Sequence, residues 1–243
     1  MKYKEYLYKQ YVSTHINKRK GLPDIRNLRR QSLGYQQHFN KHLPTDKTGR
    51  IVDLGCGSGG LVWWLIQSGF KNTKGIDGSL EQVELAHSNG IKNVEHGDVF
   101  EFLESERGCA ALFARDLIEH FEKQSLFDFL EKCFSSLKPG GLIVLQVPNA
   151  ESPYFGRVRY GDFTHELAFT TSSITQLLGA VGFEAIKVHP WRPAVTGPKS
   201  LIRYIAWRFI EPLLKLPIQI ESGGNNRVVT MNLIAVASKP LGI

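Results

Sequence analysis

The sequence lacks the features that would place the chain in a membrane or in an oxidising compartment. No stretch reaches the eighteen or so consecutive apolar residues of a membrane span, and no apolar run resembling a signal peptide follows the first residues. The three cysteines are odd in number and widely spaced, so they indicate neither a disulfide framework nor a zinc site. We therefore expect a cytoplasmic protein in a reducing environment.

Internal repeats, low-complexity segments and stretches that resemble interdomain linkers are also missing. The 243 residues, of which 42% are hydrophobic and 22% charged, are enough to bury a substantial core. These values fit one large α/β domain better than two small ones. We expect a basic helical arm over residues 1–44, and then a single domain over residues 45–243. A helical insertion at residues 191–226 would separate the last two strands of that domain.

Acidic residues are scarce near the N-terminus. Residues 1–50 contain 12 lysines and arginines against 3 aspartates and glutamates, whereas the rest of the chain is nearly balanced at 18 against 20. Such an arm suits nucleic acid, anionic lipid or a phosphorylated substrate, and it equally suits a solvated surface without a partner. The sequence lacks the interleaved aromatic and basic residues of known RNA-binding modules, so we expect no nucleic-acid partner.

Short apolar segments alternate with helical patterns along the chain. The expected strands are residues 50–54, 73–77, 94–98, 109–114, 142–147, 185–189 and 227–237. One helix is expected to end before Pro44, and another to begin with a capping box at Ser79-Leu-Glu-Gln82. Three more are expected over residues 61–66, 124–137 and 172–181. Apolar strands that alternate with helices of this length imply a parallel sheet covered on both faces.

A glycine-rich loop follows the first expected strand, in the run Asp53-Leu-Gly-Cys-Gly-Ser-Gly-Gly60. In an open parallel sheet, ligands bind beyond the carboxyl ends of the strands, and the first strand-to-helix loop is the usual cofactor wall. Glycine lets the backbone turn sharply and approach a ligand closely, because no Cβ intervenes. Dinucleotide-binding proteins use the spacing G-x-G-x-x-G, which differs from the spacing here. By itself the loop could serve several nucleotide cofactors.

Further motifs follow in order along the chain. They are Gly75-Ile-Asp-Gly-Ser79, Gly97-Asp98, Asp116-Leu-Ile-Glu-His120 and Leu137-Lys-Pro-Gly-Gly-Leu-Ile143. As a set with the glycine loop, they resemble class I S-adenosylmethionine-dependent methyltransferases over roughly residues 45–190. The resemblance implies a Rossmann-like, doubly wound α/β fold, in which helices flank a mostly parallel sheet of seven strands with the last one antiparallel. It also implies S-adenosyl-L-methionine as the cofactor.

The resemblance assigns cofactor contacts residue by residue. Asp53 and the glycines would flank the methionine moiety, and Asp77 would bond the ribose hydroxyls. Asp98 with Val99 would hold the adenine, and Arg115 would lie beside the cofactor. The full set of expected cofactor-binding residues is Asp53, Gly55, Cys56, Gly57, Gly59, Asp77, Gly78, Asp98, Val99 and Arg115.

Methyl transfer needs an acceptor placed behind the methyl group, and a hydroxyl acceptor also gains from a general base. The polar and aromatic loop at residues 160–170 follows the fifth expected strand, where it could lean over the cofactor. We predict that His165 is the base, oriented by Asp162 or Glu166, because imidazole titrates near neutral pH. The alternative is a structural role in which His165 only caps or packs.

Asp116, Glu119 and His120 stand three and four residues apart, so on a helix they would share a face that could bind a divalent ion. Some quinone-precursor and small-RNA methyltransferases have an acid-x-x-Glu-His arrangement that binds metal. In this sequence the first acid is Asp rather than Glu, and similar runs occur in many relatives without metal. We therefore predict no metal, with helix capping and cofactor-side packing as the role of these residues.

Residues 199–216 place their apolar side chains on one stripe, with Arg203, Arg208 and Lys215 largely elsewhere. This amphipathic helix, kinked near Pro212, is expected to form a lid over the acceptor site or a dimer contact. Peripheral contact with an anionic membrane at its inner face is the alternative.

Residues 152–166 and 227–234, together with the insertion, resemble methyltransferases of bacterial surface-polysaccharide biosynthesis. That resemblance implies a sugar hydroxyl as the acceptor, on a polysaccharide or on its lipid-linked or nucleotide-linked precursor. Arg157, Arg159 and Tyr160 would contact it. One rival is O-methylation of a quinone or phenolic small molecule. The other is an RNA-modifying or noncatalytic RNA-binding protein.

Overall fold

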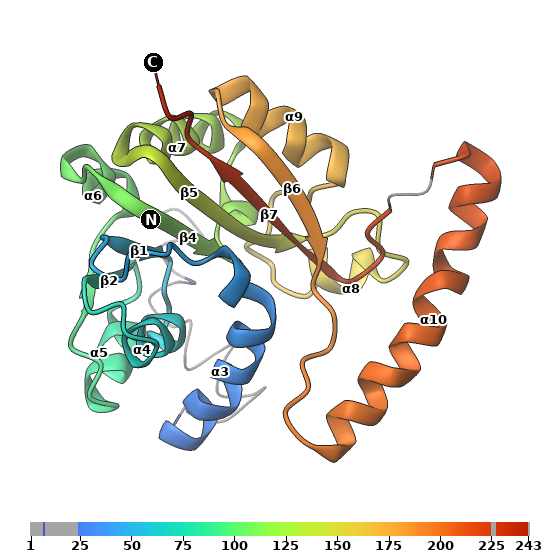
Figure 1. Ribbon diagram of the computed structural model, residues 1–243, viewed down its shortest axis with the longest axis horizontal. Coiled ribbons are helices and arrows are strands. Elements are labelled where there is room, and N and C mark those ends of the chain that lie inside the picture. Colours follow the sequence, from blue (N-terminus) through green and yellow to red (C-terminus); the bar gives the residue numbers. More distant parts are fainter. Residues whose placement is uncertain (1–6, 8–23, 225–226, 243) are drawn as a thin grey trace.

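The computed structural model describes Leu7, residues 24–224 and residues 227–242. Within them a single sheet has the strand order β3-β2-β1-β4-β5-β7-β6 (Figure 1). The strands are β1 (Ile51–Leu54), β2 (Thr73–Asp77), β3 (Val94–His96), β4 (Cys109–Arg115), β5 (Leu137–Pro148), β6 (Glu184–Pro190) and β7 (Asn232–Ser238). The first five are parallel, and β7 runs antiparallel to both β5 and β6. The predicted seven-stranded, doubly wound sheet with an antiparallel last strand is confirmed.

Helices cover both faces of this sheet because side chains alternate along each strand. Val52 and Leu54 point into a core shared with α6, α7 and α9, whereas Ile51 points into a second core with α3 and α4. Helix α5 packs beside α4 on the second face. The helices are α3 (Ile25–Phe39), α4 (Gly60–Gln67), α5 (Leu80–Ser88), α6 (Val99–Ser105), α7 (Lys123–Ser136), α8 (Phe155–Arg159), α9 (Thr171–Val181) and α10 (Pro198–Ser222), with 3-10 turns at Asn40–His42 and Ile118–His120.

Three local expectations differ from the structure. Strand β7 begins at Asn232 instead of residue 227, because the Asn149 amide binds the carbonyls of Val228 and Thr230 at 2.6 and 2.8 Å and holds that segment outside the sheet. No capping box forms at Ser79, whose buried hydroxyl has no hydrogen-bond partner. Residues 137–141 were expected only to end a helix, but they begin β5. Ends of elements depend on such side-chain bonds, which spacing alone does not reveal.

Helix α10 stands apart from the two helical layers, beside the edge of the sheet where β6 and β7 lie (Figure 1). It runs without a break through Pro212 and Pro217. Its Glu211 is buried and binds Arg192 at 2.7 Å and Lys215 at 3.0 Å. The apolar stripe faces outward, with exposed side chains at Leu201, Ile202, Ile205, Phe209, Ile210, Leu213, Leu216 and Ile220. Among the described residues, no helix has the length and hydropathy to cross a bilayer.

The segment that leads from β6 into α10 is bonded to α3. The His38 ring stacks on Trp191 with centroids 4.1 Å apart, and its Nε2 lies 3.0 Å from the Arg192 carbonyl. Gln37 adds bonds to Pro193 and Val195 on the same segment. The N-terminal helix and the insertion, far apart in sequence, therefore form one wall beside the sheet.

Candidate active site

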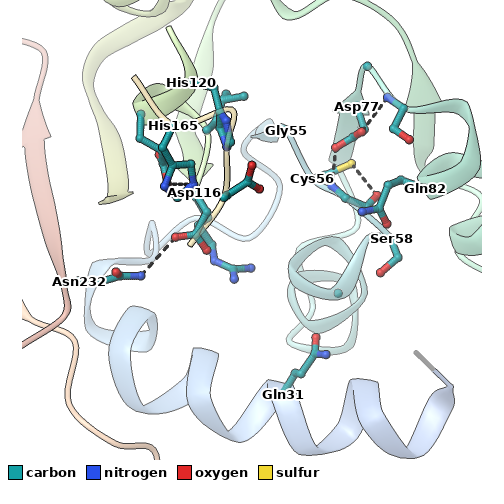
Figure 2. A pocket seen from close by; sticks show the side chains of 18 of the residues that line it. Gln31, Gly55, Cys56, Ser58, Asp77, Gln82, Asp116, His120, His165 and Asn232 are labelled. Carbon is teal, nitrogen blue, oxygen red and sulfur yellow. Dashed lines mark hydrogen bonds and ion pairs between the residues drawn. The ribbon is translucent and has the colours of Figure 1, made fainter. Parts of the chain in front are cut away.

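A cavity of about 1880 Å³ opens at the carboxyl ends of the parallel strands. Its lining comes from the glycine loop, the ends of β2 and β4, the segments at residues 96–99, 115–121 and 157–165, helix α3, and the segment leading into α10. Figure 2 shows two polar groups on opposite sides of it, Asp77 with Gln82 on one side and Asp116 with His165 on the other. This is the position in which open parallel sheets bind their ligands.

The glycine loop has the left-handed backbone that its sequence predicts. Gly55, Gly57 and Gly59 have φ values of 68°, 54° and 76°. A Cβ on Gly59 would lie 2.9 Å from Val94 Cγ2, and one on Gly60 would lie 2.8 Å from Gln31 Oε1. The loop is thus held tightly between β3 and α3, and its backbone forms the floor of the cavity where a ligand can approach it.

Asp77, at the end of β2, fixes the loop from the other side. Its Oδ2 accepts the Gly57 N–H at 2.7 Å, and its Oδ1 accepts the Ser79 N–H at 2.9 Å. Burial raises the pKa of Asp77 and outweighs the two backbone bonds, which lower it. Each carboxylate oxygen accepts more than one bond, so Asp77 can also accept hydroxyls from a ligand in the cavity.

Asp53 near the end of β1 and Arg115 at the end of β4 influence each other's ionisation. Burial raises the pKa of Asp53 to about 7, with Asp77 adding to the effect and Arg115 opposing it. Burial would lower the pKa of Arg115, but Tyr35, Asp116 and Asp53 together raise it, so the guanidinium stays charged. Asp53 Oδ1 is buried and has no hydrogen-bond partner. An unpaired buried acceptor beside a cavity suits a ligand that brings a donor.

Most of the expected cofactor residues line the cavity. The lining set is Gly55, Cys56, Gly57, Asp77, Gly78, Asp98, Val99 and Arg115. Gly59 and Asp53 lie behind this surface, since neither lines the cavity. Asp98 caps α6 by accepting the N–H groups of Phe100 and Glu101 on Oδ1. Burial, with the carboxylates of Asp53 and Asp77, raises the pKa of the Cys56 thiol well above its ordinary value, so this cysteine stays protonated.

The loop after β5 brings His165 and Asp162 to the cavity, whereas Glu166 does not line it. Arg159 folds this loop by donating to the carbonyls of His165 and Glu166. Its guanidinium is therefore occupied within the loop, and Arg157 is the arginine of this segment that lines the cavity. Burial lowers the pKa of His165 despite the nearby Asp162, so the neutral imidazole predominates at neutral pH.

Glu119 is fully buried and lines the cavity together with His120 and His165. Its Oε1 lies 4.0 Å from His165 Nε2, and neither carboxylate oxygen has a hydrogen-bond partner. Burial, with Asp116 and Asp162 adding to it, raises the pKa of Glu119 well above its ordinary value. The rings of His120 and His165 meet edge to face at 4.8 Å. A carboxyl and two imidazoles thus converge on one side of the cavity.

Asp116 does not join them. Its backbone has a φ of 50°, a left-handed value that only a few non-glycine residues adopt. Both carboxylate oxygens lie 3.1 Å from Gln146 Nε2, and Asn232 donates to Oδ1 at 3.2 Å. The expected helical face of Asp116, Glu119 and His120 is replaced by a turn followed by a 3-10 helix.

The cavity residues supplied by α3 and by the segment leading into α10 do not follow from any motif in the sequence. Gln31 and Tyr35 reach the cavity from α3, and Trp191 and Arg203 reach it from the insertion. Tyr35 Oη accepts a bond from Arg115 Nη1 at 3.0 Å, which ties α3 to the end of β4. The spacing of Leu28, Tyr35 and Phe39 indicated an amphipathic helix, but no local pattern showed what its buried face would cover.

Comparison with known sequences identifies the family. The profile of the methyltransferase domain family matches residues 27–188. A probable S-adenosylmethionine-dependent methyltransferase of Mycolicibacterium smegmatis is 25% identical over 160 residues, which are 65% of this chain and 59% of that protein. Ribosomal RNA small subunit methyltransferase C of Alcanivorax borkumensis is 30% identical over 117 residues, which are 44% of this chain and 34% of that protein. The matches span less than two thirds of both relatives.

Comparison with solved structures supports the fold. An S-adenosylmethionine-dependent methyltransferase from Archaeoglobus fulgidus superimposes with a TM-score of 0.68 at 21% identity. The alignment covers 94% of this chain and all of that one.

Proposed function

The chain belongs to the methyltransferase domain family and is an S-adenosylmethionine-dependent methyltransferase, and we propose that it methylates a sugar hydroxyl. The acceptor would be a polysaccharide or its lipid-linked or nucleotide-linked precursor. The proposal is supported by the residues that line the cavity beyond those expected to bind the cofactor.

The residues around the glycine loop fit the cofactor. Asp77 has acceptor capacity for two ribose hydroxyls at the end of β2. Asp53 lies behind the cavity surface, and its carboxylate would favour the ammonium of the methionine moiety by its charge. Gln82 Oε1 is buried without a partner in the same wall. Asp98 and Val99 provide an edge for adenine. When bound, S-adenosylmethionine supplies an electrophilic methyl group.

The opposite side of the cavity contains groups that can handle a proton. A hydroxyl is a poor nucleophile until its proton is removed or shared. His165 Nδ1 lies 3.1 Å from the Val158 carbonyl, which can only accept, so Nδ1 carries the hydrogen and Nε2 carries the lone pair. That nitrogen faces Glu119 and is the atom that would accept the proton of the acceptor.

Three arginines are the observation that carries the choice of acceptor. Arg30, Arg157 and Arg203 line the cavity from α3, α8 and α10. In the described part of the chain, none of them forms an ion pair with Asp or Glu. Guanidinium groups suit phosphate oxygens, so this wall favours an acceptor that carries phosphate, such as a nucleotide-linked or lipid-linked sugar. Tyr160 is 76% exposed on the adjoining loop and offers a flat face to a sugar ring.

Transfer of a labelled methyl group tests the proposal. The chain is incubated with methyl-labelled cofactor and with nucleotide sugars, lipid-linked glycans, phenolic quinone precursors and RNA in parallel. We expect label in the sugar, recovered as an O-methyl sugar after acid hydrolysis. Label only in the phenol would establish the first rival, and label only in RNA would establish the second. Either result would overturn the sugar assignment while leaving the methyltransferase assignment intact.

The arginine wall gives a sharper form of this test. Arg157→Ala and Arg203→Ala should each raise KM for a phosphorylated acceptor about tenfold, because a charge-assisted hydrogen bond is worth roughly 1.5 to 3 kcal/mol. Arg29→Ala is the matched control, since Arg29 is exposed on α3 next to Arg30 and does not line the cavity. Equal effects of all three substitutions would mean that the cavity arginines do not contact the acceptor.

A further inference from the structure

We propose that Glu119, His120 and His165 bind a divalent transition-metal ion at the acceptor side of the cavity. One ligand atom from each residue lies within 4.8 Å of the other two. All three residues line the cavity, so an ion there would keep positions open toward it. Two imidazoles and one carboxylate with open positions are a common donor set of catalytic zinc and related metals.

The hydrogen bonds fix which nitrogen of each imidazole has the lone pair. Thr164 Oγ1 lies 2.6 Å from Asp162 Oδ1 and 2.9 Å from His120 Nδ1. The Thr164 hydroxyl donates its single hydrogen to Asp162 and therefore accepts from His120 Nδ1. His165 Nδ1 is committed in the same way to the Val158 carbonyl. In both rings Nε2 is then the lone-pair nitrogen, and the bond at Nδ1 orients the ring as the outer partner of a metal ligand does.

Glu119 is the independent indication of a ligand. Its side chain is fully buried, and both carboxylate oxygens lack hydrogen-bond partners among the residues that the structure describes. A buried carboxyl without partners is costly, and a cation is one of the few groups that satisfies both oxygens at once. Metal bonds of about 2.1 Å need donor atoms about 3 to 4 Å apart. Donor atoms as far as 4.8 Å apart would therefore have to approach each other by about 1 to 2 Å on binding.

These three ligands differ from Asp116, Glu119 and His120, the group that the sequence pointed to as a possible metal site. Asp116 is turned away and bonded to Gln146 and Asn232, so its place is taken by His165 from the loop after β5. Two imidazoles favour a transition metal over Mg²⁺ or Ca²⁺, which prefer oxygen ligands. The expectation of no metal rested on Asp116 standing in place of a Glu, and the group proposed here does not include Asp116.

The use of the ion rests on the proposed function, whereas its binding does not. A hydroxyl that reaches an open position of the ion would lose its proton more easily, because a metal ion lowers the pKa of a bound hydroxyl. The proton would leave through the cavity to water. The oxygen would then form the new bond to the methyl carbon while the carbon–sulfur bond breaks and its electron pair stays on sulfur. His165 would then be a ligand, and the ion would replace it in activating the hydroxyl.

Cobalt binding tests the site without any activity measurement. The full chain, freed of metal by dialysis against a chelator, is titrated with Co²⁺ and followed by visible absorption and calorimetry. We expect one saturable ion per chain with d–d absorption bands. Glu119→Gln and His165→Asn should each weaken binding at least tenfold. A zinc competition should displace Co²⁺ with loss of the bands.

A matched control separates this cluster from other histidines. His42 and His189 also approach each other, with ring centroids 5.0 Å apart, and each has a buried Nε2 without a partner. His189→Asn should leave the cobalt spectrum unchanged. Loss of the spectrum in His189→Asn but not in Glu119→Gln would overturn the proposal, as would the absence of saturable binding. S-adenosylhomocysteine binding, measured on the same samples, shows that each variant is folded.

The two proposals can fail separately. If the chain binds the ion but labels no sugar, the acceptor assignment fails and the metal site stands. If it binds no Co²⁺ and methylates sugar at an unchanged rate after chelation, the metal site fails and the proposed function stands with His165 as the base.

Discussion

Asp53 links stability to pH at the level of a single residue. Its pKa is raised to about 7 in the folded chain, chiefly by burial, against about 3.9 when unfolded. The folded state thus holds the proton more tightly. The contribution of Asp53 to stability is most favourable below pH 4 and declines until the pH passes about 7, by on the order of a few kcal/mol. Asp53→Asn should therefore raise Tm by several degrees at pH 8, with a smaller gain at pH 5, as calorimetric scans across this range can measure.

The control for this prediction is Asp128→Asn, because Asp128 is exposed on α7. It should change Tm little at any pH. Asp53→Asn should also weaken binding of S-adenosylhomocysteine, since the amide removes the charge opposite the expected ammonium. A variant that is more stable but binds less well is the usual result of relieving strain at a functional site. A gain in Tm that did not depend on pH would contradict the assignment of the raised pKa to Asp53.

A comparison of Gly59 with Gly90 separates two costs of replacing a glycine that has a left-handed backbone, namely backbone strain and collision of the added Cβ. Both have positive φ, 76° and 80°, but a Cβ on Gly59 would collide with Val94, whereas one on Gly90 would have nothing within 4 Å. Gly90→Ala should cost roughly 1 to 2 kcal/mol from backbone strain alone. Gly59→Ala should cost clearly more and should also weaken cofactor binding, because β3 and the loop must move apart. Urea unfolding of both variants measures the difference, and equal losses would count against the collision.

Local sequence patterns predict some of the cavity residues but not others. Gly55, Gly57 and Asp77 could be assigned from sequence, because a glycine loop and a strand-end acid have fixed places in a parallel sheet. The group of Glu119, His120 and His165 could not. Helical spacing placed Asp116 with Glu119, but the left-handed backbone at Asp116 ends that relation. The third member, His165, comes from a loop 45 residues after His120, and no periodic pattern in the sequence predicts that the two lie close together.

At the level of elements, Glu211 fastens α10 to the rest of the molecule. Burial alone would raise its pKa, but the bonds from Arg192 and Lys215 outweigh burial and lower it. A carboxylate with a lowered pKa contributes stability above its ordinary pKa of about 4.3, and that contribution is lost as the pH falls through the folded value. Amide exchange in α10 should therefore accelerate below pH 4 before the sheet opens. Hydrogen exchange with mass spectrometry can follow the two regions separately.

Substitution tests the same contact at neutral pH. Glu211→Gln should raise exchange in α10 at pH 7 while leaving β4 and β5 protected, because only the attachment of the helix is lost. Glu221→Gln is the control, since Glu221 is exposed near the end of the same helix. Equal exchange in the two variants would show that other contacts hold α10. The solvent exposure of the apolar side chains on its outer stripe should stay the same in both variants, because these side chains are already exposed.

Some properties of α10 can be predicted from the sequence and others cannot. Its amphipathic stripe and its place between the last two strands follow from residues 199–216. Its direction does not, because the stripe was expected to pack inward or to meet a partner, and it faces outward in the described chain. The buried side chain that decides its position is polar, Glu211, and the partner Arg192 lies 19 residues earlier. Dimer and membrane contacts of this helix stay predictions.

For the whole molecule, the order of elements was predictable because strands and helices alternate along most of the chain. The arrangement of the cavity walls was not, because it depends on contacts between segments that lie more than 150 residues apart in the sequence. Helix α3 and the segment before α10 meet through His38 and Trp191, and both contribute to the cavity. A motif search limited to the sheet would describe the floor of the cavity and omit this wall.

A ligand that fills this cavity touches segments from residue 27 to residue 232, so it should bind only the folded chain. S-adenosylhomocysteine at 100 times its Kd then adds about 2.7 kcal/mol to the free energy of unfolding. Each kcal/mol shifts Tm by about 2 to 4 °C in a chain of this size, so scanning calorimetry should show a rise of about 5 to 10 °C. NAD⁺ at the same concentration should have little effect, and Asp77→Asn should lose most of the rise. An equal shift with both nucleotides would mean that the glycine loop recognises adenosine alone and that Asp53 and the methionine moiety contribute nothing to selection.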